Sequence, residues 1–355
     1  MEKLRVVQWN TGKVGRLAMQ GILDNPDLEL VGVYAHSPEK VGRDAGALCG
    51  RPDTGIKATN SIDDIIAARP HAVIYTSFTG DVDEVAKLLE AGINVLSTNL
   101  FFHVGGIRGA VKDRLQAAGE RGKASLYITG INPGWINSLA TAITAVCARV
   151  DCVSIYESAD CSGYESPETW NFFRMGQHGV TDEVIEAAKT WLVMFKDAAE
   201  RVAEGLGLEL DEVDFYCDYA TAAERVDLGW FLMEKGTNAA VRAGWNGKIN
   251  GETRVRAQIT WYLTKQIAED WDIDDKEYHL VVDGAPSVDL RMHFSNPADS
   301  PVDGAWSPTA TTSYATINAI SQIVAAKPGV LTLHDIGLPY APAGAWEKGT
   351  RRGWG

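Results

Sequence analysis

The sequence predicts an α/β chain of two domains, a doubly wound parallel sheet followed by an α+β domain with a half-open antiparallel sheet. Short apolar segments alternate with segments of helical periodicity over the N-terminal third of the chain, and parallel strands need such helical crossovers. Residues 237–294 instead alternate between apolar and polar side chains, which is typical of strands with one covered face. The length of 355 residues suits two domains that each bury a core.

The first domain is expected to span residues 1–135. Its buried strands are predicted at residues 4–9, 30–34, 72–75, 94–97 and 125–128. Its helices are predicted to begin at Val14, near Val82 and near Ile107, because apolar residues repeat there at intervals of three and four. A segment at 306–345 is expected to return to this domain, with a helix at 311–326.

The second domain is expected to span residues 136–305. Its leading elements are predicted as a helix at 136–148, a strand at 153–156 and a long amphipathic helix at 182–204. Asn246-Gly247 and Asn250-Gly251 are both predicted hairpin turns, and a further hairpin is expected to turn at Gly284-Ala285-Pro286. A sheet with an apolar face must be covered, and a second subunit is a common cover, so we expect a homodimer.

The composition argues against several classes of partner. The formal net charge of −14 repels phosphate backbones, so we expect no nucleic-acid partner. No apolar run reaches the ~20 residues of a membrane helix, and the first residues lead into a strand rather than a signal peptide, so we expect no membrane partner and a cytoplasmic location. The five cysteines form no C-x-x-C pair, so we expect free thiols and no metal site.

The junction of the first strand and the first helix carries a glycine-containing turn, Asn10-Thr11-Gly12-Lys13-Val14-Gly15. The dinucleotide-binding fingerprint is G-x-G-x-x-G, and asparagine stands here at its first glycine. Asn10 tolerates the positive φ of a tight turn, Gly12 leaves room for backbone to approach a diphosphate, and Gly15 permits close packing of helix on strand. The helix N-terminus then faces the phosphates, so we expect these six residues to bind a dinucleotide; a purely structural glycine turn is the alternative.

The end of the second strand bears on the choice of coenzyme. An acid that binds the ribose hydroxyls of NAD is typical there, and the chain instead reads Ala35-His36-Ser37-Pro38-Glu39-Lys40, with Arg43 nearby. Ser37, Lys40 and Arg43 can hold a 2′-phosphate, which favours NADP over NAD. If Lys40 and Arg43 are only solvated surface charges, NAD is the coenzyme.

Ligands of a doubly wound sheet bind outside the carboxyl ends of its strands. Three loops are predicted to leave these ends, at residues 76–79, 99–103 and 132–135. We expect Thr76 and Ser77 to contact the cofactor and Asn132 and Pro133 to shape the nicotinamide site. Proline followed by glycine also marks an ordinary turn, which is the alternative for the third loop.

Hydride transfer also needs a proton donor or a polariser for the substrate. His103 is the leading candidate, because it follows a strand end and titrates near neutrality, and a structural or solvated histidine is the alternative. Asn99 either orients the substrate or caps its loop. Glu157 and Asp160 follow the first strand of the second domain and either face the substrate or remain exposed acids. Four aromatic residues either line an apolar pocket or belong to the core or to a dimer interface: Tyr164, Trp170, Phe172 and Phe173.

Five segments match one known family in the same order: Val7 to Gly15, Val41 to Asp44, Asn94 to Thr98, Thr129 to Gly134, and Asn318 to Gly329. On these segments the chain resembles the family that shares the dihydrodipicolinate reductase N-terminal domain. It looks most similar to the branch of 2,4-diaminopentanoate dehydrogenase and the native NAD(P)-dependent amine dehydrogenases. The resemblance implies a Rossmann domain, a half-open sheet domain, a homodimer, and hydride transfer between a nicotinamide and a C=N or C=O carbon.

The chain differs from that family in two places. It has no counterpart of the paired histidines, the lysine and the D-A-P-S-G-T run of the dihydrodipicolinate reductases, so lysine biosynthesis is not expected. Amine dehydrogenases carry a glutamate just after the Ser-Thr strand end, where it handles the substrate amine. This chain has Asn99 after Ser97-Thr98 and lacks that glutamate.

Three functions therefore remain open. The first is an NAD(P)-dependent oxidoreductase that transfers a hydride to or from a C=O or C=N carbon of a small, apolar substrate. The second is an amine dehydrogenase in which a displaced acid, Glu157 or Asp160, replaces the glutamate. The third is a cofactor-binding protein without turnover.

Overall fold

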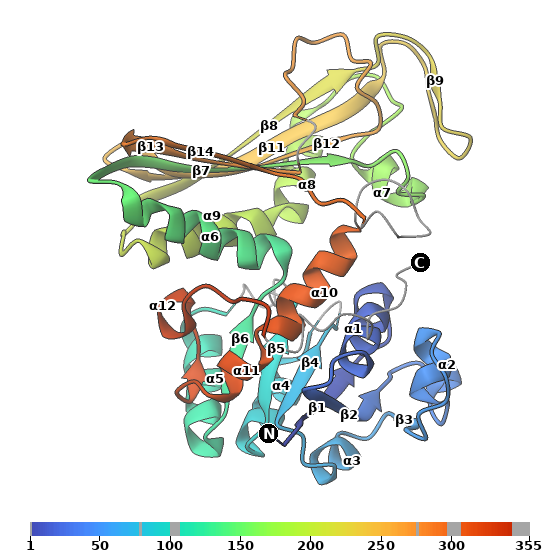
Figure 1. Cartoon of the computed structure of the whole chain (residues 1–355). Helices are drawn as coiled ribbons and strands as arrows, with labels where there is room; N and C mark the ends of the chain where they lie inside the picture. The colour runs from blue at the N-terminus through green and yellow to red at the C-terminus, as the bar shows by residue number, and fades with distance from the viewer. Residues whose placement is uncertain (1, 78–79, 100–106, 275–276, 297–306, 343–355) are drawn as a thin grey trace. The chain divides into compact units, whose positions relative to one another are not determined.

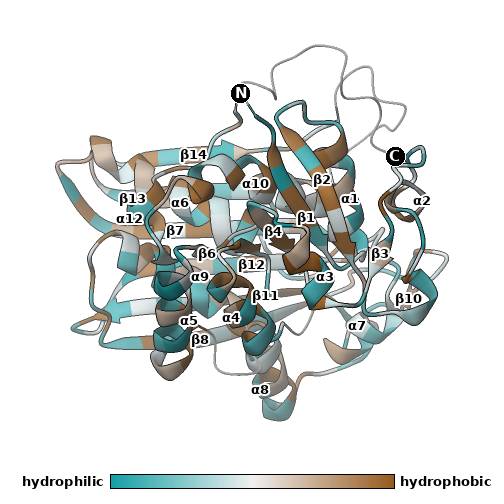
Figure 2. Cartoon of the chain, turned by 90° about the horizontal axis from the view of Figure 1, so that it is seen from below, coloured by the Kyte–Doolittle hydropathy of each residue, from teal (hydrophilic) through white to brown (hydrophobic). Residues whose placement is uncertain are grey.

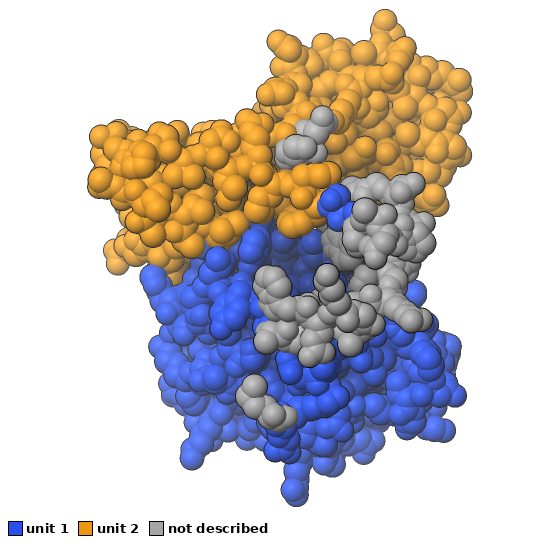
Figure 3. All heavy atoms as spheres, in the orientation of Figure 1, with its two compact units in different colours: residues 1–138, 295–355 blue, residues 139–294 orange. Residues whose placement is uncertain are grey.

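The structure is a computed structural model, and it describes residues 2–77, 80–99, 107–274, 277–296 and 307–342. The chain forms two compact units, one of residues 1–138 with 295–355 and one of residues 139–294 (Figure 3). Within the described part of the chain, no helix combines the length and apolarity that crossing a membrane requires.

The first unit contains a parallel sheet of seven strands in the order β15-β6-β5-β4-β1-β2-β3 (Figure 1). Its strands are β1 (Leu4–Trp9), β2 (Leu28–Tyr34), β3 (Ala58–Thr59), β4 (Ala72–Tyr75), β5 (Asn94–Ser97), β6 (Ser125–Ile128) and β15 (Gly329–Val330). Figure 2 shows hydrophobic stretches along β1 and β2, as expected for strands with both faces covered. The predicted doubly wound sheet is confirmed. Its six strands in the order β3-β2-β1-β4-β5-β6 have the strand order of a Rossmann fold.

Helices cover both faces of this sheet. They are α1 (Lys13–Leu23), α2 (Ala45–Cys49), α3 (Ile62–Ala67), α4 (Val82–Glu90), α5 (Gly109–Gly122), α10 (Pro308–Asn318), α11 (Ile320–Val324) and α12 (Leu333–Ile336). Helix α1 shares one core with α10, α11 and the strand residues Val6, Ile74 and Leu96. Tyr75 points to the opposite face, where its hydroxyl donates to Glu84 of α4. The single helix predicted at 311–326 is two helices, which meet at Ala319.

The second unit contains a mixed sheet of six strands in the order β14-β13-β7-β12-β11-β8. Its strands are β7 (Arg149–Asp160), β8 (Glu212–Thr221), β11 (Asn238–Ile249), β12 (Glu252–Tyr262), β13 (Tyr278–Ala285) and β14 (Val288–Met292), and β9 (Val226–Asp227) pairs separately with β10 (Leu232–Met233). All neighbours are antiparallel except β7 and β12. The predicted antiparallel sheet is thus mostly antiparallel, and the helices between β7 and β12 provide the crossover that a parallel pair needs.

Those helices cover one face of the mixed sheet, called here the covered face; the opposite face is the outer face. The helices between β7 and β12 are α7 (Pro167–Phe172), α8 (Asp182–Trp191) and α9 (Val193–Gly205), and α6 (Ile136–Ala142) runs from the first unit into this one. Helix α9 packs on β11 and β12, whose buried residues on that face include Val255, Ala257 and Ile259. The single helix predicted at 182–204 is two helices, which meet at Leu192. The Leu192 carbonyl accepts a hydrogen bond from Trp245 Nε1 at 3.1 Å.

One of the two predicted Asn-Gly turns is also wrong. Asn250 and Gly251, with φ of 54° and 78°, make the turn between β11 and β12, as predicted. Asn246 and Gly247 lie inside β11. A β-carbon on Gly247 would stand 2.6 Å from Leu210 Cδ1, so this glycine permits close packing rather than a turn.

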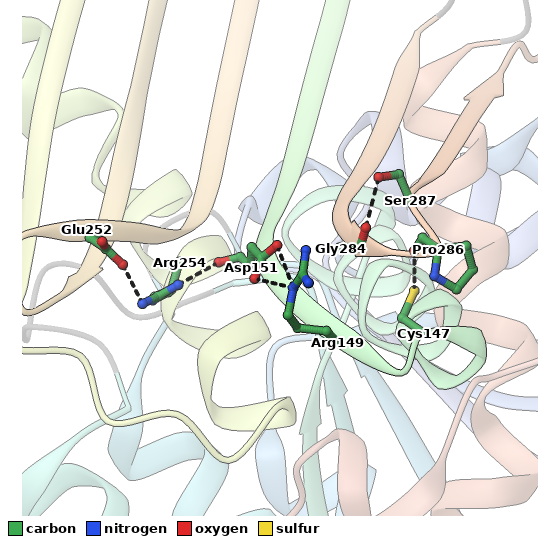
Figure 4. Close-up of polar contacts among 8 residues, drawn as sticks. All are labelled: Cys147, Arg149, Asp151, Glu252, Arg254, Gly284, Pro286 and Ser287. Atoms are coloured by element: carbon green, nitrogen blue, oxygen red, sulfur yellow. Dashed lines mark hydrogen bonds and ion pairs between the residues drawn. The ribbon is translucent and has the colours of Figure 1, made fainter.

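The hairpin of β13 and β14 turns at Pro286 and Ser287, slightly later than predicted (Figure 4). Ser287 Oγ donates to the carbonyl of Gly284 at 3.2 Å, and Cys147 Sγ donates to the carbonyl of Pro286 at 3.1 Å. Nearby, Arg254 Nη1 donates to the carbonyl of Asp151 at 3.2 Å and thereby ties β12 to β7. These contacts fix one end of the mixed sheet.

Candidate functional site

The turn between β1 and α1 has the backbone that its sequence predicts. Asn10 has a φ of 70°, and its backbone N–H donates to the carbonyl of Tyr34 at 2.9 Å. Gly12 is the N-cap of α1, with a φ of −71°. The polypeptide therefore leaves β1, passes close to the end of β2 and enters α1 within three residues.

The first turn of α1 suits an anion. No side chain caps its N-terminal amides, and it contains no acidic residue. A β-carbon built on Gly12 would meet no atom within 4 Å, so the space beside these amides is open. Exposed amides and the helix dipole together favour a phosphate group, so the residues present fit the diphosphate of a dinucleotide.

Gly15 has a different role from Gly12. A β-carbon there would collide with the carbonyl oxygen of Asn10 and would stand 2.9 Å from both Gln8 Nε2 and Thr76 Oγ1. Gln8 Nε2 donates to the carbonyl of Asn10 and to Thr76 Oγ1, each at 2.9 Å. Gln8, a strand residue that belongs to no sequence motif, therefore joins the turn to the end of β4.

The residues after β4 and β5 lie together. Asn99 Nδ2 donates to the carbonyl of Ser77 at 2.9 Å, and the Asn99 backbone N–H donates to Ser97 Oγ at 3.0 Å. The side-chain amide of Asn99 therefore joins the loop after β5 to the loop after β4, at the carboxyl ends of two neighbouring strands. Of the two roles considered for Asn99, these contacts support loop capping.

The third predicted loop forms an irregular turn, Ile131–Trp135, whose Asn132-Pro133 peptide is cis. Asn137 Oδ1 accepts a hydrogen bond from the Gly134 N–H at 2.6 Å. Helix α10 packs on this turn and on α1, where the buried Ser313 donates to the carbonyl of Val14 at 3.0 Å. The returning helix therefore braces both the first turn of α1 and the loop after β6.

No carboxylate follows the end of β2 in the way typical of NAD-specific proteins. Ser37 precedes the short helical turn Pro38–Lys40. Within the described ranges, the side chains of Lys40 and Arg43 form no ion pair or hydrogen bond with the protein, and Arg43 is exposed. Asp44 is committed to its own loop, because its carboxylate accepts from the amides of Gly46, Thr54 and Gly55 at 2.7–2.9 Å.

The two acids considered in the second unit lie on opposite faces of β7. Asp160 is exposed and caps a turn by accepting from the Ser162 N–H at 2.9 Å. Glu157 is half-buried on the covered face, where it accepts from Trp261 Nε1 at 3.3 Å and from the Tyr278 hydroxyl at 3.2 Å. Burial, followed by the charge of Glu157, raises the pKa of the Tyr278 hydroxyl, so Tyr278 remains a neutral donor.

The aromatic loop divides between core and surface. Trp170 and Phe173 are buried, whereas Tyr164 and Phe172 are exposed. The Phe173 ring contacts both Trp191 and Trp261, at centroid distances of 5.4 and 5.8 Å. The alternation of apolar and polar residues along β12 puts Trp261 on the same face as Ile259. The sequence does not predict the hydrogen bond from Trp261 to Glu157, because it does not reveal which strands are neighbours in the sheet.

His103 lies outside the described residues, so its predicted role stays a prediction. In the portions of the chain that the structure describes, no group of three or more His, Cys, Asp or Glu side chains is placed to hold a metal ion. The dinucleotide turn, the Ser77–Asn99 contact and the Ile131–Trp135 turn belong to the first unit, and Glu157 belongs to the second.

Two family models match the chain. Dihydrodipicolinate reductase, N-terminus, matches residues 6–98, and the 2,4-diaminopentanoate dehydrogenase C-terminal domain matches residues 135–352. An amine dehydrogenase of Streptomyces virginiae is 30% identical over 359 residues, which cover 96% of this chain and 97% of that protein. A 4-hydroxy-tetrahydrodipicolinate reductase of Burkholderia ambifaria is 32% identical over 114 residues, which cover 31% of this chain and 40% of that protein.

The fold is also shared with a solved structure. An amine dehydrogenase from Mycobacterium smegmatis superposes with a TM-score of 0.71 at 16% identity, over 96% of this chain and 97% of that chain. The chain therefore belongs to the 2,4-diaminopentanoate dehydrogenase C-terminal domain family, carries a dihydrodipicolinate reductase-type N-terminal domain, and is an NAD(P)-dependent oxidoreductase of the amine dehydrogenase type.

Proposed function

We propose that the protein transfers a hydride between NADP(H) and the C=N or C=O carbon of a small, apolar substrate, with oxidative deamination of an amine and its reverse as the favoured reaction. The observation that carries the proposal is the uncapped first turn of α1 beside Gly12, in a chain whose full-length relative is named an amine dehydrogenase. The bound nicotinamide supplies the hydride acceptor or donor.

The protein's own contribution is to hold and orient. The amides that open α1, together with residues 10–15, hold the diphosphate. Thr76 and Ser77, at the end of β4, and Asn132 and Pro133, in the turn that α10 braces, border the rest of the cofactor. His103 remains the proposed proton donor to the substrate.

The preference for NADP over NAD is supported by two features of the loop after β2. Lys40 and Arg43 make no ion pair with the described residues, so both cations are available to a 2′-phosphate. Asp44, the nearest acid to Arg43 along the chain, already accepts three backbone hydrogen bonds and cannot serve the ribose hydroxyls without losing them.

The test is NADPH oxidation with a panel of ketones, with and without ammonia. Ammonia-dependent oxidation is the expected result. Oxidation of NADPH at the same rate without ammonia would show that the protein reduces ketones and does not aminate them. If NADPH binds tightly but is not consumed with any ketone of the panel, the protein binds the cofactor without turnover.

We further propose that a second copy of the chain covers the outer face of the mixed sheet. Arg256 is half-buried there: its Nε donates to Asn246 Oδ1 at 3.0 Å and its Nη1 to the Tyr156 hydroxyl at 3.4 Å, and no described carboxylate pairs with it. Asp214 and Asp218 lie on the same face. In a dimer with two-fold symmetry, the outer face of one copy contacts the outer face of the other. Arg256 of each copy can therefore pair with an acid of the other copy.

A further inference from the structure

The two cations after β2 are carried by a short segment with its own hydrogen-bonded frame. The Lys40 backbone N–H donates to the carbonyl of Ser37 at 2.9 Å, and the Arg43 N–H donates to the carbonyl of Lys40 at 3.1 Å. Two consecutive turns therefore fix the backbone from Ser37 to Arg43. Residues 37–43 are called here the cation segment.

A second segment, residues 54–58, runs antiparallel to the end of the cation segment. The Gly42 N–H donates to the carbonyl of Ala58 at 2.7 Å, and the Ala58 N–H donates to the carbonyl of Arg43 at 2.9 Å. Ala58 also begins β3, the edge strand of the parallel sheet, which pairs with β2 (Figure 1). The backbone at Arg43 is thus tied to the sheet through residues 54–58.

The side chain of Asp44, which is half-buried, joins these two segments. Its Oδ1 accepts from the Thr54 N–H at 2.9 Å, and its Oδ2 accepts from the Gly55 N–H at 2.8 Å. Oδ1 also accepts from the Gly46 N–H at 2.7 Å and so caps α2. One carboxylate therefore fastens residues 54 and 55 to the residue that follows Arg43.

The charge of Asp44 by itself would disfavour a phosphate beside Arg43. Three backbone N–H groups and the Thr54 hydroxyl donate to this carboxylate, and their dipoles offset part of its charge. Lys40 and Arg43 form no ion pair with the described residues, so their backbone sets where both cations can reach. A cation on a backbone that is already fixed loses less conformational freedom when it binds a phosphate.

We propose that Asp44 is a positioning residue for the choice of coenzyme: by fastening residues 54 and 55 to the cation segment, it holds Arg43 where it meets the 2′-phosphate of NADP(H). The inference rests on the proposed NADP preference and deepens it, because it assigns part of that preference to a carboxylate that does not contact the coenzyme. An acid that binds the ribose hydroxyls favours NAD. Asp44 has the opposite effect because backbone amides occupy its oxygens.

The test measures the Kd values of NADPH and NADH for the full chain by fluorescence titration. Wild type should bind NADPH more tightly than NADH. Asp44→Asn keeps the size of the side chain but turns an N–H group toward a backbone donor. The Kd for NADPH should therefore rise about tenfold, the lower bound for losing one hydrogen bond to a charged group, and the Kd for NADH should stay unchanged. An equal rise in both Kd values, or tighter binding of NADPH, overturns the inference.

A second comparison asks whether Asp44 acts through the two cations. Lys40→Ala with Arg43→Ala removes the groups that Asp44 is proposed to position. Adding Asp44→Asn to this pair should cause no further rise in the Kd for NADPH, because the effects of residues that act through one another do not add. A further rise of about tenfold, the full effect of the single substitution, would show that Asp44 acts independently and would refute the inference.

Asp335→Asn is the matched control, because Asp335 also binds a backbone amide at the start of a short helix of the first unit. Its Oδ2 accepts from the Thr332 N–H at 2.7 Å and from the Thr332 hydroxyl at 2.9 Å. This variant should lose stability and keep the coenzyme preference. If Asp44→Asn does not fold, Asp44→Ser replaces it, because serine still caps α2 but cannot reach both Thr54 and Gly55. The preference for NADPH must then fall, and an unchanged preference refutes the proposal.

The wild-type titration keeps this inference separate from the proposed function. If wild type binds neither coenzyme, the proposed function fails and the inference fails with it. If wild type binds both coenzymes equally, the NADP preference and the inference fail while the oxidoreductase reaction stands. If wild type prefers NADPH and Asp44→Asn keeps the full preference, the inference alone fails.

Discussion

Gly12→Ala separates cofactor binding from folding at the dinucleotide turn. The φ of −71° at Gly12 is open to any residue, and a β-carbon there meets no atom within 4 Å. Alanine is a poorer N-cap than glycine by about 0.5–1 kcal/mol. Alanine also lowers the conformational entropy of the unfolded chain, which stabilises the folded protein by about 0.4–1 kcal/mol. The free energy of unfolding should therefore change by less than about 1 kcal/mol.

The effect on affinity should be larger. The added methyl group fills the space beside the α1 amides that a diphosphate oxygen needs. Loss of one hydrogen bond to a charged group costs about 1.5–3 kcal/mol, which corresponds to a rise of about 10- to 150-fold in the Kd for NADPH. Fluorescence titration with NADPH measures this Kd, and thermal unfolding of the same sample measures stability.

Gly15→Ala is the control with the opposite expectation. Its β-carbon would collide with the Asn10 carbonyl, which is backbone and cannot rotate away, so a loss of about 1–3 kcal/mol or more in stability is expected. If Gly12→Ala were folded and bound NADPH as tightly as wild type, the diphosphate would not lie beside these amides. If Gly12→Ala lost as much stability as Gly15→Ala, the space beside Gly12 would not be open.

Three further predictions concern other parts of the chain. Lys40→Ala with Arg43→Ala should raise the Kd for NADPH by about tenfold or more and leave that for NADH unchanged, as measured by parallel titrations; an equal loss for both coenzymes contradicts the 2′-phosphate role. Arg256→Glu should convert the dimer to a monomer in light scattering, and a dimer that persists refutes the outer-face interface. Hydrogen bonds from the amides of Thr54, Gly46 and Gly55 hold the pKa of Asp44 below its ordinary value. The ionised carboxylate therefore stabilises the fold above a pH of about 4, and this stabilisation is lost as the pH falls through the lower pKa of the folded state. Asp44→Asn should therefore lower the Tm at neutral pH, and the difference from wild type should shrink at acidic pH; a constant difference contradicts the assignment.

The first unit could largely be predicted from the sequence because its strands are buried on both faces and its helices are periodic. β1, β4, β5 and β6 begin and end where the apolar runs do. The β3 and β15 strands have only two residues each, and β15 pairs with β6 across about two hundred residues of chain. Neither leaves a local pattern, so neither was predicted.

The errors in the second unit have a common physical origin. Asn246-Gly247 is a strong local turn signal, but the packing of Leu210 against Gly247 requires an extended strand there. The helix at 182–204 has continuous periodicity, but it breaks at Leu192, whose carbonyl accepts the hydrogen bond from Trp245. In both places a contact between residues distant in sequence overrides a local preference.

The choice between Glu157 and Asp160 shows why a site is harder to predict than a fold. Residues three apart on a strand point to opposite faces, so the sequence already implies that only one of these acids can lie beside the apolar residues of β7. Val153 and Ile155 are buried on the covered face, and Glu157 continues their alternation. What the sequence does not reveal is which strands flank β7, and those strands supply Trp261 and Tyr278. The chemistry of Glu157 therefore depends on register between strands more than one hundred residues apart, which only the assembled sheet determines.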